Sequence, residues 1–175
     1  MELLITDHQP LYFPGIMKLE ECYPPGLQEG EKSKSDLIEL ADVQLWMWLN
    51  NELVGECLGI RLSTLLHARG EREIFDSWQR EKDWFKAVYG ASTNEENIIY
   101  CYATAILPKH RGRGFGRWLK QLWLREAKIK GYKLAVGHST SNAIDKINLG
   151  FGRHCHTIED WCGYGHKASY YVIVL

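Results

Sequence analysis

A glycine- and arginine-rich turn at residues 105–116 constrains the fold of this chain more than any other feature. It follows a segment rich in β-branched and aromatic residues and precedes one with apolar residues at helical spacing. It therefore predicts a strand, a turn and a helix in that order. Glycine has no Cβ, so backbone N–H groups at the start of such a helix can approach a ligand closely. The helix dipole adds partial positive charge at the same place, and the turn therefore predicts a site for a phosphate or pyrophosphate group.

Two other phosphate-binding motifs do not match this turn. A Walker A loop ends in Gly-Lys-Ser or Gly-Lys-Thr, whereas Gly116 is followed by Arg117 and Trp118. A dinucleotide-binding fingerprint needs glycines spaced as G-x-G-x-x-G, and Gly112, Gly114 and Gly116 have a different spacing. What remains is a different anion-binding signature, or a structural turn with incidental arginines.

The spacing matches a known family. Arg111-x-x-Gly114-x-Gly116, preceded by Ile106-x-Pro108, resembles the acetyl-coenzyme A signature of the GNAT superfamily of N-acetyltransferases. The resemblance implies an α/β (α+β) fold with a central mixed, mostly antiparallel sheet. It also implies a V-shaped splay between the signature strand and the next parallel strand, and helices on both faces. The implied function is transfer of an acetyl group from acetyl-CoA, the co-substrate, to a primary amine that attacks the thioester directly.

The chain as a whole fits one acetyltransferase-like domain over residues 1–175, a length typical of a single domain. Its clearest local signal is a hairpin, because two apolar runs flank Asn50 and Asn51. A helical pattern at about residues 63–97 does not match the family and is interpreted as an insertion. It is either a helix packed on the sheet edge, or a lid or homodimer contact over the acceptor site. We expect strands at residues 3–6, 43–49, 53–62, 98–107, 133–136, 154–161 and 169–175, and further helices at 16–22, 35–41, 114–130 and 142–149.

The resemblance assigns roles to residues on the signature strand and turn. The coenzyme pyrophosphate would lie on the backbone of the turn, and the pantetheine arm would pair with the end of the strand. The backbone N–H of Ile106 would stabilise the oxyanion of the tetrahedral intermediate, a contribution of about 3 kcal/mol. Gly150 and Phe151 resemble the family's N…GF element. The coenzyme-binding residues implied are Thr104, Ala105, Ile106, Arg111, Gly112, Arg113, Gly114, Phe115, Gly116, Arg117 and Asn142.

The pattern leaves the general acid and base open. Members of the family commonly carry a tyrosine acid where this chain has Lys146, so Lys146, Tyr164 and Tyr170 are candidates for protonating the departing thiolate. A glutamate base is often found on the signature strand, but this strand carries Tyr100 and Tyr102, which share one face. Both tyrosines could contact an acceptor or pack in the core, and a chain of waters could take the proton from the amine.

The net charge of −1 is the sum of two blocks of opposite sign. Residues 1–60 hold eleven acidic and three basic residues, whereas residues 108–130 hold eight basic residues and one acidic residue. We interpret the basic block as the coenzyme side and the acidic block as the side of a cationic acceptor, a small-molecule or peptide amine. Two alternatives remain. One is an acyltransferase directed to nucleic acid, which the near-neutral net charge disfavours. The other is a GNAT-like protein that binds acyl-CoA or a partner without turnover.

Cysteine and histidine content bears on the compartment and on metal binding. The chain has an odd number of cysteines, five, and neither a signal peptide nor an apolar run that could span a membrane, so we expect a cytoplasmic protein without a membrane partner. His154, Cys155 and His156 would alternate across a strand and lack the spacing of a zinc site, so we expect no metal. His138 follows a strand directly and is a candidate for the cleft.

Overall fold

The computed structural model describes residues 2–7, 13–67, 95–160 and 165–175. In this part of the chain seven strands form one sheet in the order β1-β2-β3-β4-β5-β7-β6. Neighbouring strands are antiparallel except β4 and β5, which are parallel. The mixed, mostly antiparallel sheet expected from the sequence is therefore confirmed. The strands are β1 (Leu3–Thr6), β2 (Val43–Leu49), β3 (Glu52–Arg61), β4 (Ile98–Ile106), β5 (Leu134–Ser139), β6 (Arg153–Ile158) and β7 (Ala168–Val174).

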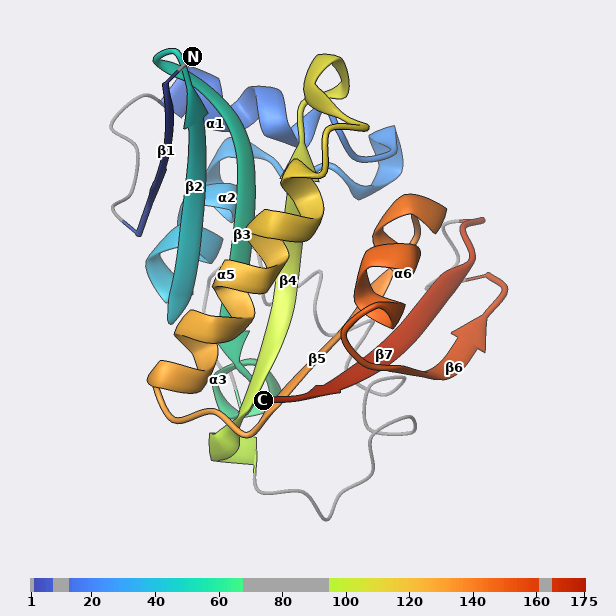
Figure 1. Cartoon of the computed structure of the whole chain (residues 1–175). Helices are drawn as coiled ribbons and strands as arrows, with labels where there is room; N and C mark the ends of the chain where they lie inside the picture. The colour runs from blue at the N-terminus through green and yellow to red at the C-terminus, as the bar shows by residue number, and fades with distance from the viewer. Residues whose placement is uncertain (1, 8–12, 68–94, 161–164) are drawn as a thin grey trace.

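Helices cover both faces of the sheet, as expected. Figure 1 shows α5 crossing one face of β2, β3 and β4, with α1 and α2 on the other. Alternate residues of β3 contact these two layers, because successive side chains of a strand point to opposite faces. Gly59 packs against Trp123 of α5, whereas Glu56 contacts Lys34 of α2. The helices are α1 (Phe13–Glu20), α2 (Glu31–Leu40), α3 (Leu62–His67), α5 (Phe115–Ile129) and α6 (Asn142–Leu149).

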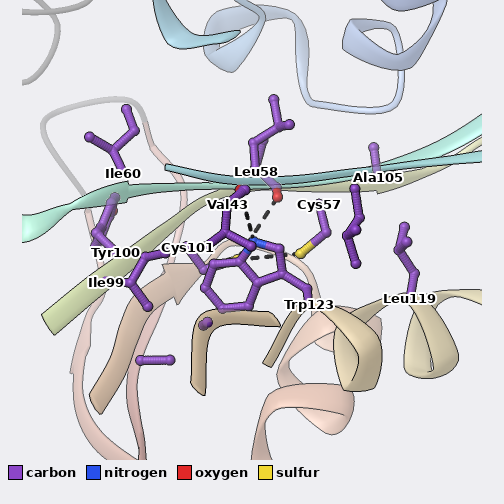
Figure 2. Packing of buried hydrophobic residues seen from close by; sticks show 14 of the residues in the cluster. Val43, Cys57, Leu58, Ile60, Ile99, Tyr100, Cys101, Ala105, Leu119 and Trp123 are labelled. Atoms are coloured by element: carbon purple, nitrogen blue, oxygen red, sulfur yellow. Dashed lines mark hydrogen bonds between the residues drawn. The ribbon is translucent and has the colours of Figure 1, made fainter. Parts of the chain in front are cut away.

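Trp123 anchors α5 to the sheet. Its side chain is fully buried, and its indole Nε1–H donates a hydrogen bond to the carbonyl of Val43, 3.1 Å away. Figure 2 shows the ring among buried side chains of neighbouring strands, including Cys57 and Ile99. A Cβ at Gly59 would lie 2.2 Å from the ring, so only glycine leaves room for it. This contact holds the helix axis over the sheet and so positions the N-terminus of α5 beside the end of β4.

Local signals placed most elements, and the hairpin is confirmed. Asn50 and Asn51 have φ angles of 49° and 63°, which a two-residue turn of this type requires. The predicted start of α2 was wrong, because the helix begins at Glu31 rather than at residue 35. The boundary rested on Ser35 as a plausible N-cap, but the N-cap is Gly30, which has no side chain to signal it, and Lys34 lies within the helix at a buried position.

The structure also shortens one expected strand. β6 ends at Ile158, and Asp160 then accepts a hydrogen bond from the N–H of Gly165 at 2.7 Å, which closes a turn. Trp161, the last residue expected in that strand, lies outside the described residues.

The insertion expected at about residues 63–97 is described only at its two ends. Its first residues continue the short helix α3, and Glu95–Asn97 form a single 3-10 turn before β4. Residues 68–94, which carry the helical pattern, lie outside the described residues, so the insertion and the single-domain boundary stay predictions. None of the helices in the described ranges combines the length and the apolar character needed to cross a lipid bilayer.

The two parallel strands diverge, and this divergence creates the site. β4 and β5 pair at only three positions, the last of them Tyr100 with Val136. Beyond that point β4 stays paired with β3, and β5 stays paired with β7. Figure 1 shows the two strands separating toward the end of β4. The V-shaped splay expected between the signature strand and its parallel neighbour is therefore confirmed.

Candidate active site

A cavity of about 530 Å³ lies where β4 and β5 diverge. Five segments that are distant in sequence form its wall: the α1–α2 connection, β4, the turn before α5, the end of β5, and α6. The residues that line it include Glu20, Tyr23, Glu29, Tyr100, Cys101, Tyr102, Thr104, Ala105, Ile106, Arg111, Gly112, Gly114, Phe115, Gly116, Arg117, His138 and Ile147. Most of the residues expected to bind coenzyme are therefore brought together.

The glycine-rich turn ends in an open helix N-terminus. Gly112 and Gly114 have φ angles of 76° and 80°, and Gly114 is the N-cap of α5 without a side-chain cap. A Cβ added at either position would have no atom within 4 Å, so open space faces the backbone here. The first N–H groups of a helix have no acceptor within the helix, and the helix dipole makes them a favourable site for an anion. The turn therefore presents an open helix N-terminus to the cavity, and its role as an anion site stays a prediction.

Arginine side chains secure and charge this end of the cavity. Arg111 Nε donates a 2.9 Å hydrogen bond to the carbonyl of Ile106, which ties the turn to the end of β4. Arg117 lies over the ring of Phe151, with its guanidinium carbon 5.2 Å from the ring centroid. Both arginines line the cavity, whereas Arg113 is exposed and is not among the lining residues.

The backbone of β4 presents hydrogen-bonding groups to the gap. Leu107 N–H donates to the Val54 carbonyl of β3 at 2.9 Å. Antiparallel partners alternate between residues that exchange hydrogen bonds and residues that do not, so the N–H groups of Ile106 and Thr104 point away from β3. The carbonyl of Ile106 has the same orientation, because it accepts the bond from Arg111. This edge can pair with an extended ligand, and the orientation suits the donor role predicted for Ile106.

A β-bulge in the middle of β4 displaces Tyr102. Ala103 pairs with Leu58 and Cys101 pairs with Gly59, so Tyr102 is the one extra residue of β4 at this register shift. Its hydroxyl donates a 3.0 Å hydrogen bond to Oε1 of Glu29, from the segment between α1 and α2. Sequence reasoning identified the tyrosine but had no signal for the bulge, because a bulge is a property of strand pairing.

Tyr100 lies beside a histidine on the opposite wall of the gap. Its hydroxyl shares a 2.5 Å hydrogen bond with Nδ1 of His138, at the point where β5 has diverged from β4. Burial lowers the pKa of His138 to about 4, so the imidazole is neutral near pH 7. The rings of Tyr100 and Tyr102 meet edge to face at a centroid distance of 6.0 Å. This part of the cavity wall therefore brings the phenol groups of Tyr100 and Tyr102 together with the neutral imidazole of His138.

A buried ionic cluster supports the acidic wall. The N–H of Glu29 donates to Oε2 of Glu20 at 2.9 Å, and Oε1 of Glu20 contacts Nζ of Lys34 at 2.6 Å. The same ammonium contacts Oε1 of Glu56 at 2.7 Å, and all three of these ionic side chains are buried. Burial raises the pKa of Glu56, and the ammonium of Lys34 offsets part of that rise. Sequence reasoning missed this cluster, because a lysine and a glutamate 22 positions apart carry no local signal of contact.

Two predicted residues of α6 lie outside the cavity wall. Asn142 and Lys146 are exposed, and α6 contributes apolar side chains such as Ile144 and Ile147 instead. Their roles stay predictions. Of the other candidate acids, Tyr164 lies outside the described residues. Tyr170 is buried with its ring 5.5 Å from that of His138.

Metal ligands do not gather in this site. Within the described ranges, no three histidine, cysteine or acidic side chains are grouped in a way that could hold a metal ion. His154 and His156 lie on β6, and both are exposed.

Comparison with known proteins identifies the fold. No protein-family model and no curated protein sequence matches the chain. Solved structures do match. The Drosophila melanogaster polyamine N-acetyltransferase, described as catalysing formation of N-acetylagmatine, aligns over 99% of this chain and 100% of its own at 13% identity and a TM-score of 0.71. The ribosomal-protein-S18-alanine N-acetyltransferase of Escherichia coli aligns over 99% and 94% at 9% identity, with a TM-score of 0.68.

A third match is a chain of the NatC complex bound to Gag peptide and CoA, which aligns over 100% of this chain and 99% of its own at 11% identity and a TM-score of 0.66. At such low identities the likeness establishes the fold. The chain has the fold of the GNAT N-acetyltransferases, as the signature turn led us to expect.

Proposed function

We propose that this protein is an N-acyltransferase that moves an acetyl group from acetyl-CoA to a primary amine by direct attack. The observation that carries the proposal is the shape of the cavity. An open anion-binding helix N-terminus lies at one end, an unpaired strand edge runs along its length, and a glutamate with two tyrosines forms another part of its wall. A molecule with a pyrophosphate, an extended amide-containing arm and a thioester matches the first two features in order.

In the proposed complex the pyrophosphate lies on the N–H groups from Gly112 to Gly116, beside Arg111 and Arg117. The pantetheine arm pairs with the open edge of β4 at residues 104–106. The N–H of Ile106, or that of Thr104 with the same orientation, donates to the thioester oxygen and stabilises the oxyanion as it forms.

The reaction needs no nucleophile from the protein. The amine nitrogen bonds to the carbonyl carbon, and the tetrahedral intermediate then collapses by breaking the carbon–sulfur bond. CoA leaves as a thiolate and becomes protonated, while the amine loses one proton. Tyr100 and Tyr102 lie on the cavity wall where a phenol could donate or relay these protons, and we retain them with Lys146 as candidates.

The proposed acceptor is a cationic amine, either a small molecule or a peptide. Glu29 supplies a carboxylate on the cavity wall, and its Oε1 is held by the Tyr102 hydroxyl. A neutral amine attacks but an ammonium binds, so a carboxylate at this place favours capture of the protonated form before proton loss. The matched Drosophila polyamine N-acetyltransferase catalyses the formation of N-acetylagmatine, which supports the proposal without establishing it.

Release of free CoA thiol from acetyl-CoA across a panel of amines tests both parts. We expect release with polyamine or peptide amines and none with neutral or anionic acceptors. Glu29→Gln should raise KM for a cationic acceptor about tenfold, the size of a lost charged hydrogen bond, with a smaller change in kcat. Glu31→Gln is the control, because Glu31 is exposed and does not line the cavity. Coenzyme binding without release by any amine would instead support a non-catalytic acyl-CoA-binding protein.

We also propose a cytoplasmic location. Four described cysteines, Cys22, Cys57, Cys101 and Cys155, are free thiols, which suits a reducing compartment. Fractionation of cells that produce the tagged protein tests this location. A homodimer through the 63–97 insertion stays a prediction, and light scattering of the purified chain measures it.

A further inference from the structure

A buried lysine on α5 contacts a cysteine of the signature strand. Lys120 is 1% exposed, and its Nζ donates to Sγ of Cys101 at 2.8 Å and to the hydroxyl of Tyr171 at 3.1 Å. The ammonium also lies 5.0 Å from the centre of the Trp123 ring and 5.2 Å from that of Tyr171. Among the described residues no carboxylate forms an ion pair with it. A buried ammonium is costly without a counter-charge, and the thiolate of Cys101 supplies one.

The charge of Cys101 follows from its neighbours. Burial alone would raise the pKa of this thiol, but the hydrogen bond with Cys57 and the ammonium of Lys120 together hold the pKa well below its ordinary value. The pKa of Lys120 is raised in turn: burial alone would lower it, and the negative charge of Cys101 outweighs that effect. Both shifts favour the form in which Cys101 is a thiolate and Lys120 an ammonium, and the 2.8 Å contact between the two atoms suits that form.

A second thiol lies next to this thiolate. Sγ of Cys57, on β3, is 3.8 Å from Sγ of Cys101, and both cysteines are free. Burial and the neighbouring Cys101 raise the pKa of Cys57 well above its ordinary value, so Cys57 keeps its proton. Cys101 lines the cavity and Cys57 does not. The two sulfurs thus differ in charge and in access, as an attacking thiolate and a resolving thiol do.

We propose that Cys101 and Cys57 form a redox-active thiol pair, in which hydrogen peroxide that enters the cavity oxidises Cys101 and Cys57 resolves the product as a disulfide. The Cys101 thiolate attacks one peroxide oxygen, the oxygen–oxygen bond breaks, and Cys101 becomes a sulfenic acid. The hydroxide that leaves takes a proton from Lys120 and departs as water. The Cys57 thiol then attacks the sulfenic sulfur and a second water leaves. Two sulfurs are oxidised, one peroxide is reduced to two waters, and Lys120 ends neutral.

This site is separate from the proposed acyl transfer and does not depend on it. It nevertheless adjoins the coenzyme path, since Sγ of Cys101 lies 3.3 Å from the side-chain hydroxyl of Thr104. Sγ of Cys57 lies 3.4 Å from the same hydroxyl, so a disulfide would form beside Thr104 and would remove the counter-charge of Lys120 there. Oxidation of the two thiols would therefore change the charge beside the cavity wall at Thr104.

The test is peptide mapping of the intact protein after treatment with hydrogen peroxide at pH 7, with free thiols alkylated before digestion. We expect a peptide that joins Cys57 to Cys101 and that dithiothreitol separates. Cys155 is exposed and far from this cluster in sequence, so it is the internal reference for unassisted oxidation. If Cys155 is oxidised while Cys57 and Cys101 stay reduced, the proposal is wrong.

Variants separate the roles of the three side chains. In Cys57→Ser we expect Cys101 to stop at the sulfenic acid, which dimedone captures. In Lys120→Met we expect oxidation of Cys101 to slow at least about thirtyfold, since an ordinary thiol is only about 3% ionised at pH 7. Lys128→Met is the matched control, because Lys128 lies on the same helix and is exposed. An unchanged rate in Lys120→Met would overturn the assignment. A loss of CoA release with normal oxidation would concern only the proposed acyl transfer.

Discussion

The glycine at the start of α5 offers the sharpest test of the proposed coenzyme site. Gly114 has a φ of 80°. Gly131, just past the other end of the same helix, also has a positive φ, of 92°. A Cβ at either position has no atom within 4 Å, so the two substitutions Gly114→Ala and Gly131→Ala differ in location but not in steric crowding. Each should cost about 1–2 kcal/mol of stability, because an L-residue is strained in the left-handed region. That is a fall in Tm of roughly 2–8 °C for a chain of this size.

Only one of the two changes should weaken coenzyme binding. Gly114 lines the cavity, and the methyl group added in Gly114→Ala would occupy the space through which the pyrophosphate would reach the helix N–H groups. Losing one charged hydrogen bond costs about 1.5–3 kcal/mol, a roughly 10- to 150-fold rise in Kd for acetyl-CoA. Gly131 does not line the cavity, so Gly131→Ala should bind coenzyme like the unchanged protein.

Titration calorimetry measures the affinity, and thermal unfolding with and without coenzyme measures its consequence. At a coenzyme concentration 100 times the Kd of the unchanged protein, binding adds about 2.7 kcal/mol of stability, and a tenfold weaker variant gains about half of that. Equal affinity in Gly114→Ala and Gly131→Ala at the unchanged value would refute the anion site. Equal loss in both would show that binding responds to helix strain rather than to the space at Gly114.

Two further predictions concern buried charges. Lys34→Met leaves the carboxylates of Glu20 and Glu56 buried without their ammonium and should lower the free energy of unfolding by about 3–5 kcal/mol in urea. The exposed Lys32→Met should change it by less than about 1 kcal/mol, and equal effects would contradict the ionic cluster. The pKa of His138 is lowered from 6.5 to about 4, so the unfolded chain binds its proton first as the pH falls. The free energy of unfolding should therefore drop by up to about 3 kcal/mol between pH 6.5 and 4. In His138→Gln the urea midpoint should depend less on pH over that range. If the midpoints of the variant and of the unchanged protein fall in parallel with pH, a neutral buried histidine is excluded.

The elements that the sequence predicted well are those governed by local chemistry. Asn50 and Asn51 adopt positive φ at low cost, so the hairpin could be placed from two residues. The glycine-rich turn was recognisable for the same reason, since Gly112 and Gly114 also need positive φ. The fold was predicted through the resemblance of that turn to the acetyl-coenzyme A signature of the GNAT superfamily.

The parts that could not be predicted depend on contacts between distant segments. Lys34 lay just before the expected helix at 35–41, and Lys120 lay in the expected helix at 114–130 without any signal of burial, yet both are fully buried against partners on other elements. Helical periodicity describes which face is apolar, and a buried lysine looks the same in it as an exposed one. The bulge that displaces Tyr102 is equally hidden, because it exists only once β3 and β4 are paired.

The opposed charge blocks in the sequence act through fewer residues than their totals suggest. In the acidic block, Glu20 and Glu56 share the single ammonium of Lys34, which offsets one of their two charges, and Glu29 is a further carboxylate on the cavity wall. In the basic block, Arg111 and Arg117 line the cavity, and Lys120 is turned inward to Cys101. The net charges of the blocks are therefore a poor measure of the field, because exposed charges are screened by solvent and buried ones are paired. The charges that would act on a ligand in the cavity are those of its lining residues, positive at Arg111 and Arg117 and negative at Glu29. A coenzyme with its phosphates at the arginines would present its thioester toward the acidic wall, where a cationic amine would be held.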